Sequence, residues 1–227
     1  MSSVSAIVVA AGKGLRLKSK TAKPLINIDG KPAIIYALRV LNKEPRVKEI
    51  IIAANPDNIQ GIRKVVKKYR INKAKKIILG GARRQDSVFN GLKVAEGDMV
   101  LIHDAGRPFI DSKIVRFSIA QAQKSGAAIV GVPVKATIKA VGSSQALVVR
   151  ATLDRSRLWE IQTPQVFNKD LLLEAYRKFG NEKVTDDASL VEKLGKKVKI
   201  VLGSYNNIKI TTPEDLVLAQ AIAKNLR

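Results

Sequence analysis

The sequence predicts an α/β fold: a Rossmann-like, mostly parallel twisted sheet with helices on both faces, plus a protruding β-hairpin arm. The first observation is that short apolar runs alternate with helical periodicity through residues 6–134. Alternation at this spacing is typical of parallel strands joined by helical crossovers. The second is that the alternation stops at residues 137–154, which have the pattern of a hairpin. With 227 residues and no linker-like stretch, residues 1–227 are expected to form one domain.

Strands are expected where short, mostly apolar runs stand between polar or turn-forming residues. Five such runs occur in the first part of the chain, and a sixth follows the helical segments beyond the hairpin. The expected strands are Ala6–Ala10, Glu49–Ala54, Lys75–Leu79, Asp98–Asp104, Ala127–Val134 and Lys197–Gly203.

Helices are expected where apolar residues recur at helical spacing. Pro32 precedes the first, Asp86 and Ser87 are expected to cap the third, and Thr212 with Pro213 to begin the last. The expected helices are Ala33–Lys43, Asn58–Arg70, Ser87–Ala95, Ser112–Lys124, Asn168–Phe179, Asp186–Gly195 and Thr212–Leu226.

The hairpin arm is expected at about residues 135–155, with Gly142, Ser143 and Ser144 at its tip. Nothing around Thr137–Asp154 indicates a helix that would cover it. An apolar hairpin standing off a domain has to pack on something. A second subunit is therefore the expected partner of the arm.

The chain is strongly basic, with 41 Lys and Arg against 19 Asp and Glu and a net charge of +22. Residues 58–85 contain ten Lys or Arg and no acid, which suits a polyanion. However, the apolar residues of Asn58–Arg70 recur at helical spacing, and Tyr69 is the one aromatic residue of the basic stretch. A solvated helix face is favoured over a nucleic-acid site.

The same composition bears on location and redox chemistry. There is no cysteine, which excludes disulfides and thiolate metal sites. No apolar stretch approaches the roughly 20 residues that span a bilayer. The first residues lack the basic segment of a signal peptide. A cytoplasmic protein without membrane contact is expected.

The loop "AAGKGLRLKSKTAKPL" after the first strand matches neither the Walker motif nor the dinucleotide motif. Gly12 and Gly14 allow close approach of a ligand to the backbone, and successive N–H groups can form an anion nest. Arg16 and Lys23 add full charges from both sides of the stretch. A tight turn with solvated lysines is the alternative.

The segment "HDAGRP" follows the fourth strand and places Asp104 and Arg107 at its carboxyl end. A carboxylate beside a phosphate loop is a natural ligand for Mg²⁺. Arg107 can bind a second phosphate, or the two residues can form a local pair that shapes the turn. His103, the only histidine, is expected to be structural.

A third loop, "GGARRQDS", offers Gly80 and Gly81 for close backbone approach and then Arg84. Separated cations around phosphate loops suit a reaction between two anionic substrates, because such transfers need positioning and charge neutralisation. The cations concerned are Arg16, Lys23, Arg84, Arg107, Arg155 and Lys209.

These residues resemble a known family. The chain contains, in the family's order, the segments "AAGKGLRLKSKTAKP", "GGARRQDSV", "HDAGRP", "LDRSRLWEIQTPQVF", "TDDASLVE" and "NIKITTPEDL". Together they are similar to the 2-C-methyl-D-erythritol 4-phosphate cytidylyltransferases over essentially the whole chain. The first segment alone marks only the wider nucleotidyltransferase class.

The resemblance implies a reaction in non-mevalonate isoprenoid biosynthesis. CTP and 2-C-methyl-D-erythritol 4-phosphate give CDP-methylerythritol and pyrophosphate, by in-line attack on the α-phosphate of CTP with Mg²⁺ as cofactor. The alternatives are a cytidylyltransferase for ribitol 5-phosphate or another polyol phosphate, and, in a different class, a basic nucleic-acid-binding protein.

The resemblance also implies residue roles, with Arg16 and Lys23 stabilising transition-state charge and Arg155 and Lys209 holding the polyol phosphate. It implies a homodimer in which the arm brings Arg155 to the neighbouring active site. Asp104 is the expected metal ligand, whereas Asn206 replaces an aspartate of some members, and Gly106 is often alanine. The expected nucleotide-binding residues are Ala10, Ala11, Gly12, Gly14, Gly81, Ala82, Arg84 and Ser87. The expected substrate-binding residues are Asp104, Arg107, Thr137, Thr163 and Thr185.

Overall fold

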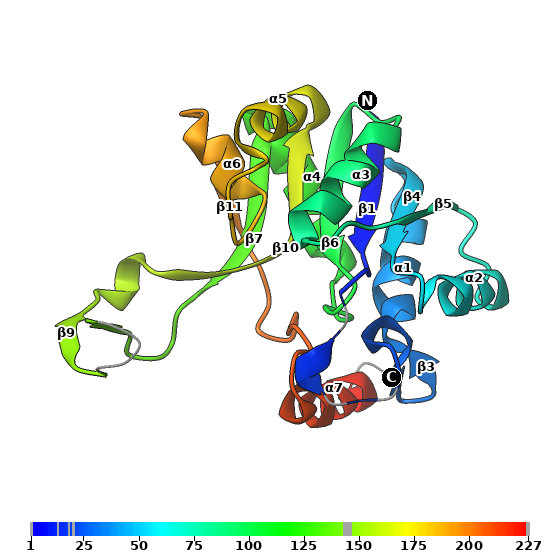
Figure 1. Cartoon of the computed structure of the whole chain (residues 1–227), viewed down its shortest axis with the longest axis horizontal. Coiled ribbons are helices and arrows are strands. Elements are labelled where there is room, and N and C mark those ends of the chain that lie inside the picture. The colour runs from blue at the N-terminus through cyan, green and yellow to red at the C-terminus, as the bar shows by residue number, and fades with distance from the viewer. Residues whose placement is uncertain (1, 13, 18, 20, 143–146, 226–227) are drawn as a thin grey trace.

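The computed structural model describes residues 2–12, 14–17, 19, 21–142 and 147–225. Its centre is a seven-stranded sheet in the order β11-β7-β10-β6-β1-β4-β5, in which only β10 runs antiparallel to its neighbours. The mostly parallel α/β fold expected from the sequence is confirmed (Figure 1). The strands are β1 (Val4–Val9), β4 (Val47–Ala54), β5 (Ala74–Leu79), β6 (Met99–Asp104), β7 (Ala127–Pro133), β10 (Trp159–Asn168) and β11 (Lys199–Leu202).

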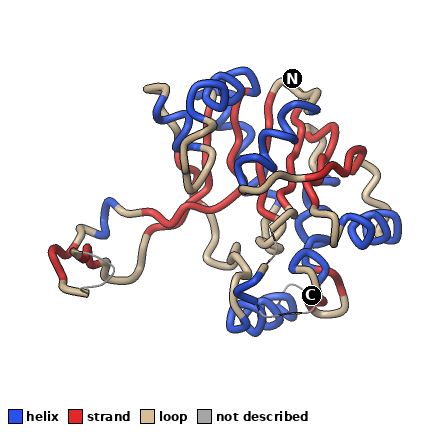
Figure 2. The backbone as a smooth tube through the Cα atoms, in the orientation of Figure 1, coloured by secondary structure: helices blue, strands red, loops and turns tan. Residues whose placement is uncertain are grey.

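Helices cover both faces of this sheet, as the tube view also shows (Figure 2). One face packs against α1 (Ala33–Lys43), α2 (Ile59–Lys68) and α4 (Ser112–Ser125). The other packs against α3 (Arg84–Val94), α5 (Lys169–Phe179) and α6 (Ala188–Lys193). The parallel strands between these two helix layers carry apolar side chains on both faces. Each face of the sheet therefore buries its apolar residues against one layer of helices.

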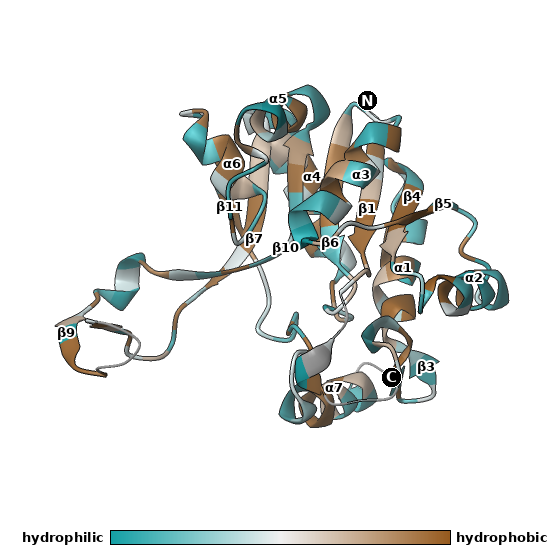
Figure 3. Cartoon of the chain, in the orientation of Figure 1, coloured by the Kyte–Doolittle hydropathy of each residue, from teal (hydrophilic) through white to brown (hydrophobic). Residues whose placement is uncertain are grey.

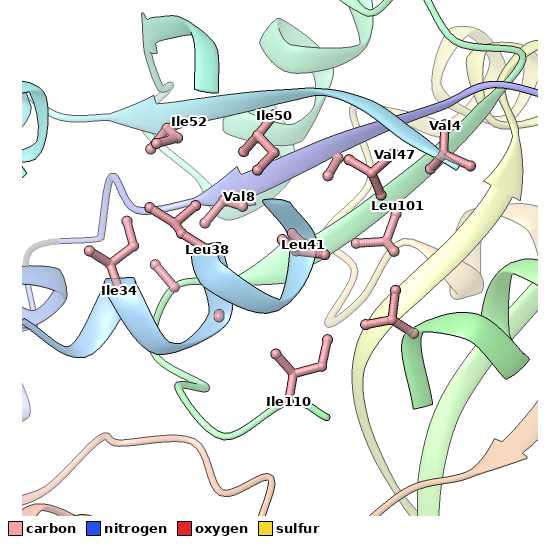
Figure 4. Packing of buried hydrophobic residues seen from close by; sticks show 14 of the residues in the cluster. Val4, Val8, Ile34, Leu38, Leu41, Val47, Ile50, Ile52, Leu101 and Ile110 are labelled. Carbon is pink, nitrogen blue, oxygen red and sulfur yellow. The ribbon is translucent and has the colours of Figure 1, made fainter. Parts of the chain in front are cut away.

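The core beneath α1 shows why the helix lies there. Ile34, Leu38 and Leu41 recur at helical spacing and are fully buried against strand residues such as Val8 and Ile52 (Figure 4). Side chains at this spacing lie on one face of a helix. Burial of each such side chain stabilises the fold by roughly 1.5–3 kcal/mol.

A third, smaller cluster lies apart from the two main layers. Helix α7 (Pro213–Asn225) begins with Pro213, as expected, and packs on the short hairpin of β2 (Asn27–Ile28) and β3 (Lys31–Pro32). Figure 1 shows α7 beyond the lower ends of the strands. Helix α7 thus lies on the side of the molecule to which the carboxyl ends of the parallel strands point.

Two local expectations need correction. Helix α3 begins at Arg84, three residues before the expected Ser87, and Asp86 is its third residue rather than its cap. The Asp86 carboxylate accepts a hydrogen bond from the backbone N–H of Arg83, at 2.9 Å, which is the half of a capping box that the third helical residue supplies. Strand β10 was not expected, because Gln162, Thr163 and Gln165 break its apolar run although all three are buried.

The arm is a hairpin of β8 (Lys139–Val141) and β9 (Val149–Thr152), paired antiparallel. It projects away from the sheet in Figure 1, and β9 is among its apolar parts in Figure 3. Leu147 and Val148 are 80% and 68% exposed. The expected tip residues Ser143 and Ser144 lie outside the described residues.

No helix in the described part of the chain combines the length and the apolar composition that crossing a bilayer requires.

Candidate active site

A cavity of about 670 Å³ opens at the carboxyl ends of β1, β5 and β6. All eight residues expected to bind nucleotide line it, together with four of the expected charged residues. The shared set is Ala10, Ala11, Gly12, Gly14, Gly81, Ala82, Arg84 and Ser87, with Arg16, Lys23, Asp104 and Lys209. The three loops that the sequence analysis singled out are thus brought to one place.

The loop after β1 folds back on itself at Gly14, whose φ of +66° is one that residues with side chains rarely adopt. A Cβ atom at Gly14 would stand 3.3 Å from the Cβ of Lys23. The turn at Gly14 therefore lies against the side chain of Lys23. Arg16 lies in the short 3₁₀ turn Leu15–Leu17 between them.

Lys23 is a half-buried cation at the edge of the cavity. Burial lowers the pKa of its ammonium group, and the nearby charges of Lys209 and Arg16 lower it further, against the opposing effect of Asp104. Lys23 forms no direct ion pair with any residue that the structure describes. An anionic ligand would relieve the repulsion among these three cations.

The loop after β5 needs its glycines for close packing. A Cβ at Gly80 would come within 2.5 Å of the Ala11 Cβ and 2.6 Å of the Ser87 Oγ. The Gly81 N–H donates to the Ser87 Oγ at 3.0 Å, which ties the loop to the first turns of α3. Small residues thus let the loops after β1 and β5 approach each other.

Asp104 ends β6 and is held between two cations. Its Oδ1 accepts from the Arg84 Nε at 2.9 Å, and its Oδ2 accepts from the Lys209 Nζ at 2.6 Å. Burial by itself raises the pKa of the Asp104 carboxyl, but the charges of Arg84 and Lys209 outweigh it and hold that pKa well below its usual range. Asp104 is therefore ionised at neutral pH.

Arg84 extends this network away from the cavity. Its Nη1 donates at 2.7 Å to Asp187, which is fully buried and also accepts from the Tyr176 hydroxyl at 2.6 Å. Although burial opposes charge, the two carboxylates raise the pKa of Arg84. The sequence analysis did not single out Asp187. Asp186 and Asp187 precede a helix, where acidic residues commonly act as caps.

Arg107 is buried and has protein partners. Its guanidinium donates to the carbonyl of Asn207 at 2.6 Å and to that of Ile161 at 3.3 Å. These bonds tie the turn after β6 to β10 and to the segment that carries Lys209. The structure therefore places Arg107 beside the site as a brace, and its expected contact with a phosphate stays a prediction.

His103 is completely buried, as expected for a structural residue. The Asp104 N–H donates to the Thr163 Oγ1 at 3.1 Å, and this hydroxyl lies 3.0 Å from the His103 Nδ1. The His103 Nε2 lies 2.9 Å from the Arg107 carbonyl, which can only accept. The proton is thus on Nε2, and the Thr163 hydroxyl donates to Nδ1.

A second cavity, of about 460 Å³, lies on the other side of Asp104. Three residues, Arg84, Asp104 and Lys209, line both cavities. The expected substrate residues Arg107, Thr163 and Thr185 line the second one. The two cavities therefore meet at the Asp104 ion cluster.

Two expected site residues are not brought to either cavity. Thr137 precedes β8 and Arg155 follows β9, so both belong to the arm. Both are exposed, and the Arg155 Nη1 donates to the Lys135 carbonyl at 2.7 Å. One chain alone does not place them at the site.

The protein offers few side-chain ligands for Mg²⁺ at the first cavity. Asp104 is the only acid among the described residues that line the first cavity, and the described part of the chain has no cluster of three metal-ligating side chains. Each Asp104 oxygen accepts one bond from a cation and retains a second lone pair. Asn206 is exposed and offers no carboxylate. The residues fit a metal held mainly by phosphate oxygens, with Asp104 as its protein ligand.

The sequence of this chain matches a known protein family. Residues 4–225 match the family described as 2-C-methyl-D-erythritol 4-phosphate cytidylyltransferase. The chain belongs to this family. Curated cytidylyltransferases of that name from Bacillus cereus and Halalkalibacterium halodurans are 45% and 43% identical over 221 residues, which is 96% of this chain and of each relative.

Solved structures agree with the sequence match. The 4-diphosphocytidyl-2C-methyl-D-erythritol synthase of Anaerococcus prevotii superposes with a TM-score of 0.84 at 33% identity, and the alignment covers 98% of this chain and 99% of that one. The 2-C-methyl-D-erythritol 4-phosphate cytidylyltransferase of Thermus thermophilus gives 0.78 at 31% identity, with the same coverage. The resemblance seen in the motifs therefore extends to the whole fold.

The burial of His103 predicts a specific loss of stability in acid. Burial lowers its pKa from 6.5 to about 4, so the unfolded chain binds the proton first as pH falls. Stability should be level above pH 7 and fall by about 2 kcal/mol between pH 7 and pH 5. Urea unfolding at the two pH values measures this.

The variant His103→Gln is the control, since it removes the chain's one histidine. It should be less stable at pH 7 but nearly level between pH 7 and pH 5. An unchanged slope in this variant would show that other groups cause the acid sensitivity.

Proposed function

We propose that the chain transfers the cytidylyl group of CTP to 2-C-methyl-D-erythritol 4-phosphate, giving CDP-methylerythritol and pyrophosphate in non-mevalonate isoprenoid biosynthesis. This is the activity of the family to which it belongs. The observation that carries the proposal is that two cavities meet at Arg84, Asp104 and Lys209. A transfer between two anionic substrates needs two such sites that share a cationic boundary.

The first cavity suits CTP. Its walls combine small residues, which let a base and a triphosphate lie close to backbone N–H groups, with Arg16 and Lys23, which form no ion pair with a described residue. In this proposal, Arg16 and Lys23 bind the phosphates and stabilise the charge that develops during transfer. Cations fixed before the reaction act this way at little reorganisation cost.

The second cavity suits the polyol phosphate. Thr185 offers a hydroxyl group for the polyol, Thr163 forms part of the wall with its hydroxyl bonded to His103 and Asp104, and Lys209 offers a charge for the phosphate at the boundary between the cavities. Lys209 would exchange its bond with Asp104 for one with the incoming phosphate. Asp104 would then be available to a cation bound with CTP.

The chemical step needs no protein base. A phosphate monoester is mostly ionised near neutral pH, so its oxygen is already a nucleophile. That oxygen attacks the α-phosphorus of CTP in line, a new P–O bond forms, and the bond to the β-phosphate oxygen breaks. The electron pair leaves with pyrophosphate, whose negative charge Arg16 and Lys23 neutralise.

Mg²⁺ is the proposed cofactor, held by Asp104 together with phosphate oxygens of CTP. When bound, it would neutralise phosphate charge and polarise the reacting phosphorus–oxygen bonds. The cytoplasmic location expected from the sequence stays a prediction.

A homodimer formed through the arm is the remaining part of the proposal. The arm exposes Val141, Leu147, Val148, Val149 and Leu153, an apolar surface that a single chain leaves in water. Neither Thr137 nor Arg155 lines either of the two cavities described above. Exchange of arms would cover the apolar residues and bring both side chains to the neighbouring second cavity.

The activity is tested by following pyrophosphate release from CTP with each candidate polyol phosphate. The purified chain should use 2-C-methyl-D-erythritol 4-phosphate in preference to ribitol 5-phosphate. Turnover of ribitol 5-phosphate alone would contradict the proposed acceptor. Tight nucleic-acid binding without any CTP-dependent turnover would overturn the enzyme assignment.

Lys23→Ala should lower kcat by about a hundredfold or more, because it removes a charge that stabilises the transition state. Initial-rate kinetics against both substrates measure the effect. Lys64→Ala, on the exposed face of α2, is the matched control and should keep the wild-type kcat. If kcat is unchanged in Lys23→Ala, Lys23 has no part in the chemical step.

Arg155→Ala should raise the KM for the polyol phosphate more than that for CTP. A heterodimer of one Arg155→Ala chain and one Lys23→Ala chain tests whether Arg155 acts across the interface. Arm exchange gives one intact site, so about half of the wild-type activity should return. Two inactive sites in that heterodimer would show that Arg155 serves its own chain.

A further inference from the structure

Two asparagines at the start of α2 bond to each other's backbone. The Asn55 N–H donates to the Asn58 Oδ1 at 3.0 Å, and the Asn58 N–H donates to the Asn55 Oδ1 at 2.9 Å. Each side chain is therefore held in one orientation, with its oxygen turned inward and its amide nitrogen outward. Rotating either amide by 180° would set N–H groups against N–H groups.

The outward amide nitrogens reach two consecutive carbonyls of the nucleotide loop. The Asn58 Nδ2 donates to the Ala10 carbonyl at 2.8 Å, and the Asn55 Nδ2 donates to the Ala11 carbonyl at 3.0 Å. Backbone carbonyls beyond a strand end have lost their ladder partners. The asparagine pair supplies new partners at the point where β1 becomes the loop.

This arrangement determines where the next two N–H groups point. In a trans peptide, the C=O and the following N–H point in opposite directions. With the carbonyls of Ala10 and Ala11 turned toward the asparagines, the N–H groups of Ala11 and Gly12 point away from them. Neither N–H has a hydrogen-bond partner within the described ranges, and both residues line the first cavity. Two successive N–H groups that point to the same side can donate to a bound anion or to a carbonyl oxygen of a ligand.

Helix α2 also contacts the other end of the loop. A Cβ at Gly61 would overlap the Leu25 side chain, two residues after Lys23. The first turn of α2 thus meets the loop near both of its ends, through Asn58 at Ala10 and through Gly61 at Leu25. A shift of this turn would move both the N–H pair and the segment that carries Lys23.

We propose that Asn55 and Asn58 are positioning residues for nucleotide binding, which aim the N–H groups of Ala11 and Gly12 into the cavity. The inference rests on the proposed function, because the ligand that these N–H groups receive is CTP. Asn58 is only 1% exposed, so it acts through the Ala10 peptide rather than by touching the nucleotide. Asn55 lines the cavity and adds the second bond.

The test is the kinetics of Asn58→Ala with both substrates, beside calorimetric binding of CTP. Wild-type turnover of CTP is measured first and decides the proposed function independently. In Asn58→Ala, the KM and the Kd for CTP should rise about tenfold or more. The KM for the polyol phosphate should stay within about twofold of wild type, since the second cavity is not lined by this turn.

The matched control is Asn90→Ala on α3, which removes an asparagine whose Nδ2 donates to the Leu79 carbonyl. It should leave both KM values unchanged. If Asn58→Ala weakens both substrates alike, or leaves CTP binding at the wild-type value, the positioning role is overturned.

A second variant keeps the test decisive if Asn58→Ala does not fold. Asn58→Asp retains the inward oxygen, but its carboxylate is ionised near neutral pH and cannot donate to the Ala10 carbonyl. The Kd of this variant for CTP at pH 8 should therefore be at least tenfold above that of the wild type. A wild-type Kd for CTP in a folded Asn58→Asp variant would contradict the proposal.

Discussion

The interaction on which the rest of the site depends is the Asp104 carboxylate, held between the guanidinium of Arg84 and the ammonium of Lys209. Its two oxygens are 2.9 Å and 2.6 Å from those cations. A buried carboxylate is costly unless it is paired, and here both oxygens are paired with cations from distant parts of the chain. The network joins the loops after β5 and β6 to the segment before α7.

Around this carboxylate, cationic side chains outnumber anionic ones. In the described part of the chain, the carboxylates that bond to the cations Arg84 and Lys209 are Asp104 and Asp187, whereas Arg16 and Lys23 line the same cavity without an ion pair. Lys23 has the lowered pKa that follows from burial among like charges. Such a site is most stable with an anion bound, and it lies where two cavities meet. The geometry therefore suits transfer between two phosphate-bearing substrates, which is the family's reaction.

Much of this arrangement could be predicted from local sequence. The apolar runs that became β1, β4, β5, β6 and β7 were all expected, because parallel strands buried on both faces are apolar throughout. The glycine loops and Asp104 could be predicted for a different reason. Ligand sites of α/β sheets follow the carboxyl ends of the strands.

The parts that were missed depend on contacts between distant residues. Strand β10 carries buried polar side chains whose partners lie elsewhere, as when Gln165 bonds to Asp186, so it lacks a clear apolar pattern. The protein partners of Arg107, Asn207 and Ile161, are over 50 residues away in the sequence, so its bracing bonds have no local sequence signal. Asn55 and Asn58 have the composition of an ordinary turn. Their bonds to Ala10 and Ala11 appear only once β4 lies beside β1.

We propose that the two cavities hold the two substrates on opposite sides of Asp104. A crystal structure with a non-hydrolysable CTP analogue, Mg²⁺ and 2-C-methyl-D-erythritol 4-phosphate tests this arrangement most directly. We expect the triphosphate against the loop of Gly12 and Gly14, the polyol beside Thr163 and Thr185, and the α-phosphorus near the boundary between the two cavities. A nucleotide bound in the second cavity, or both ligands on the same side of Asp104, would contradict it.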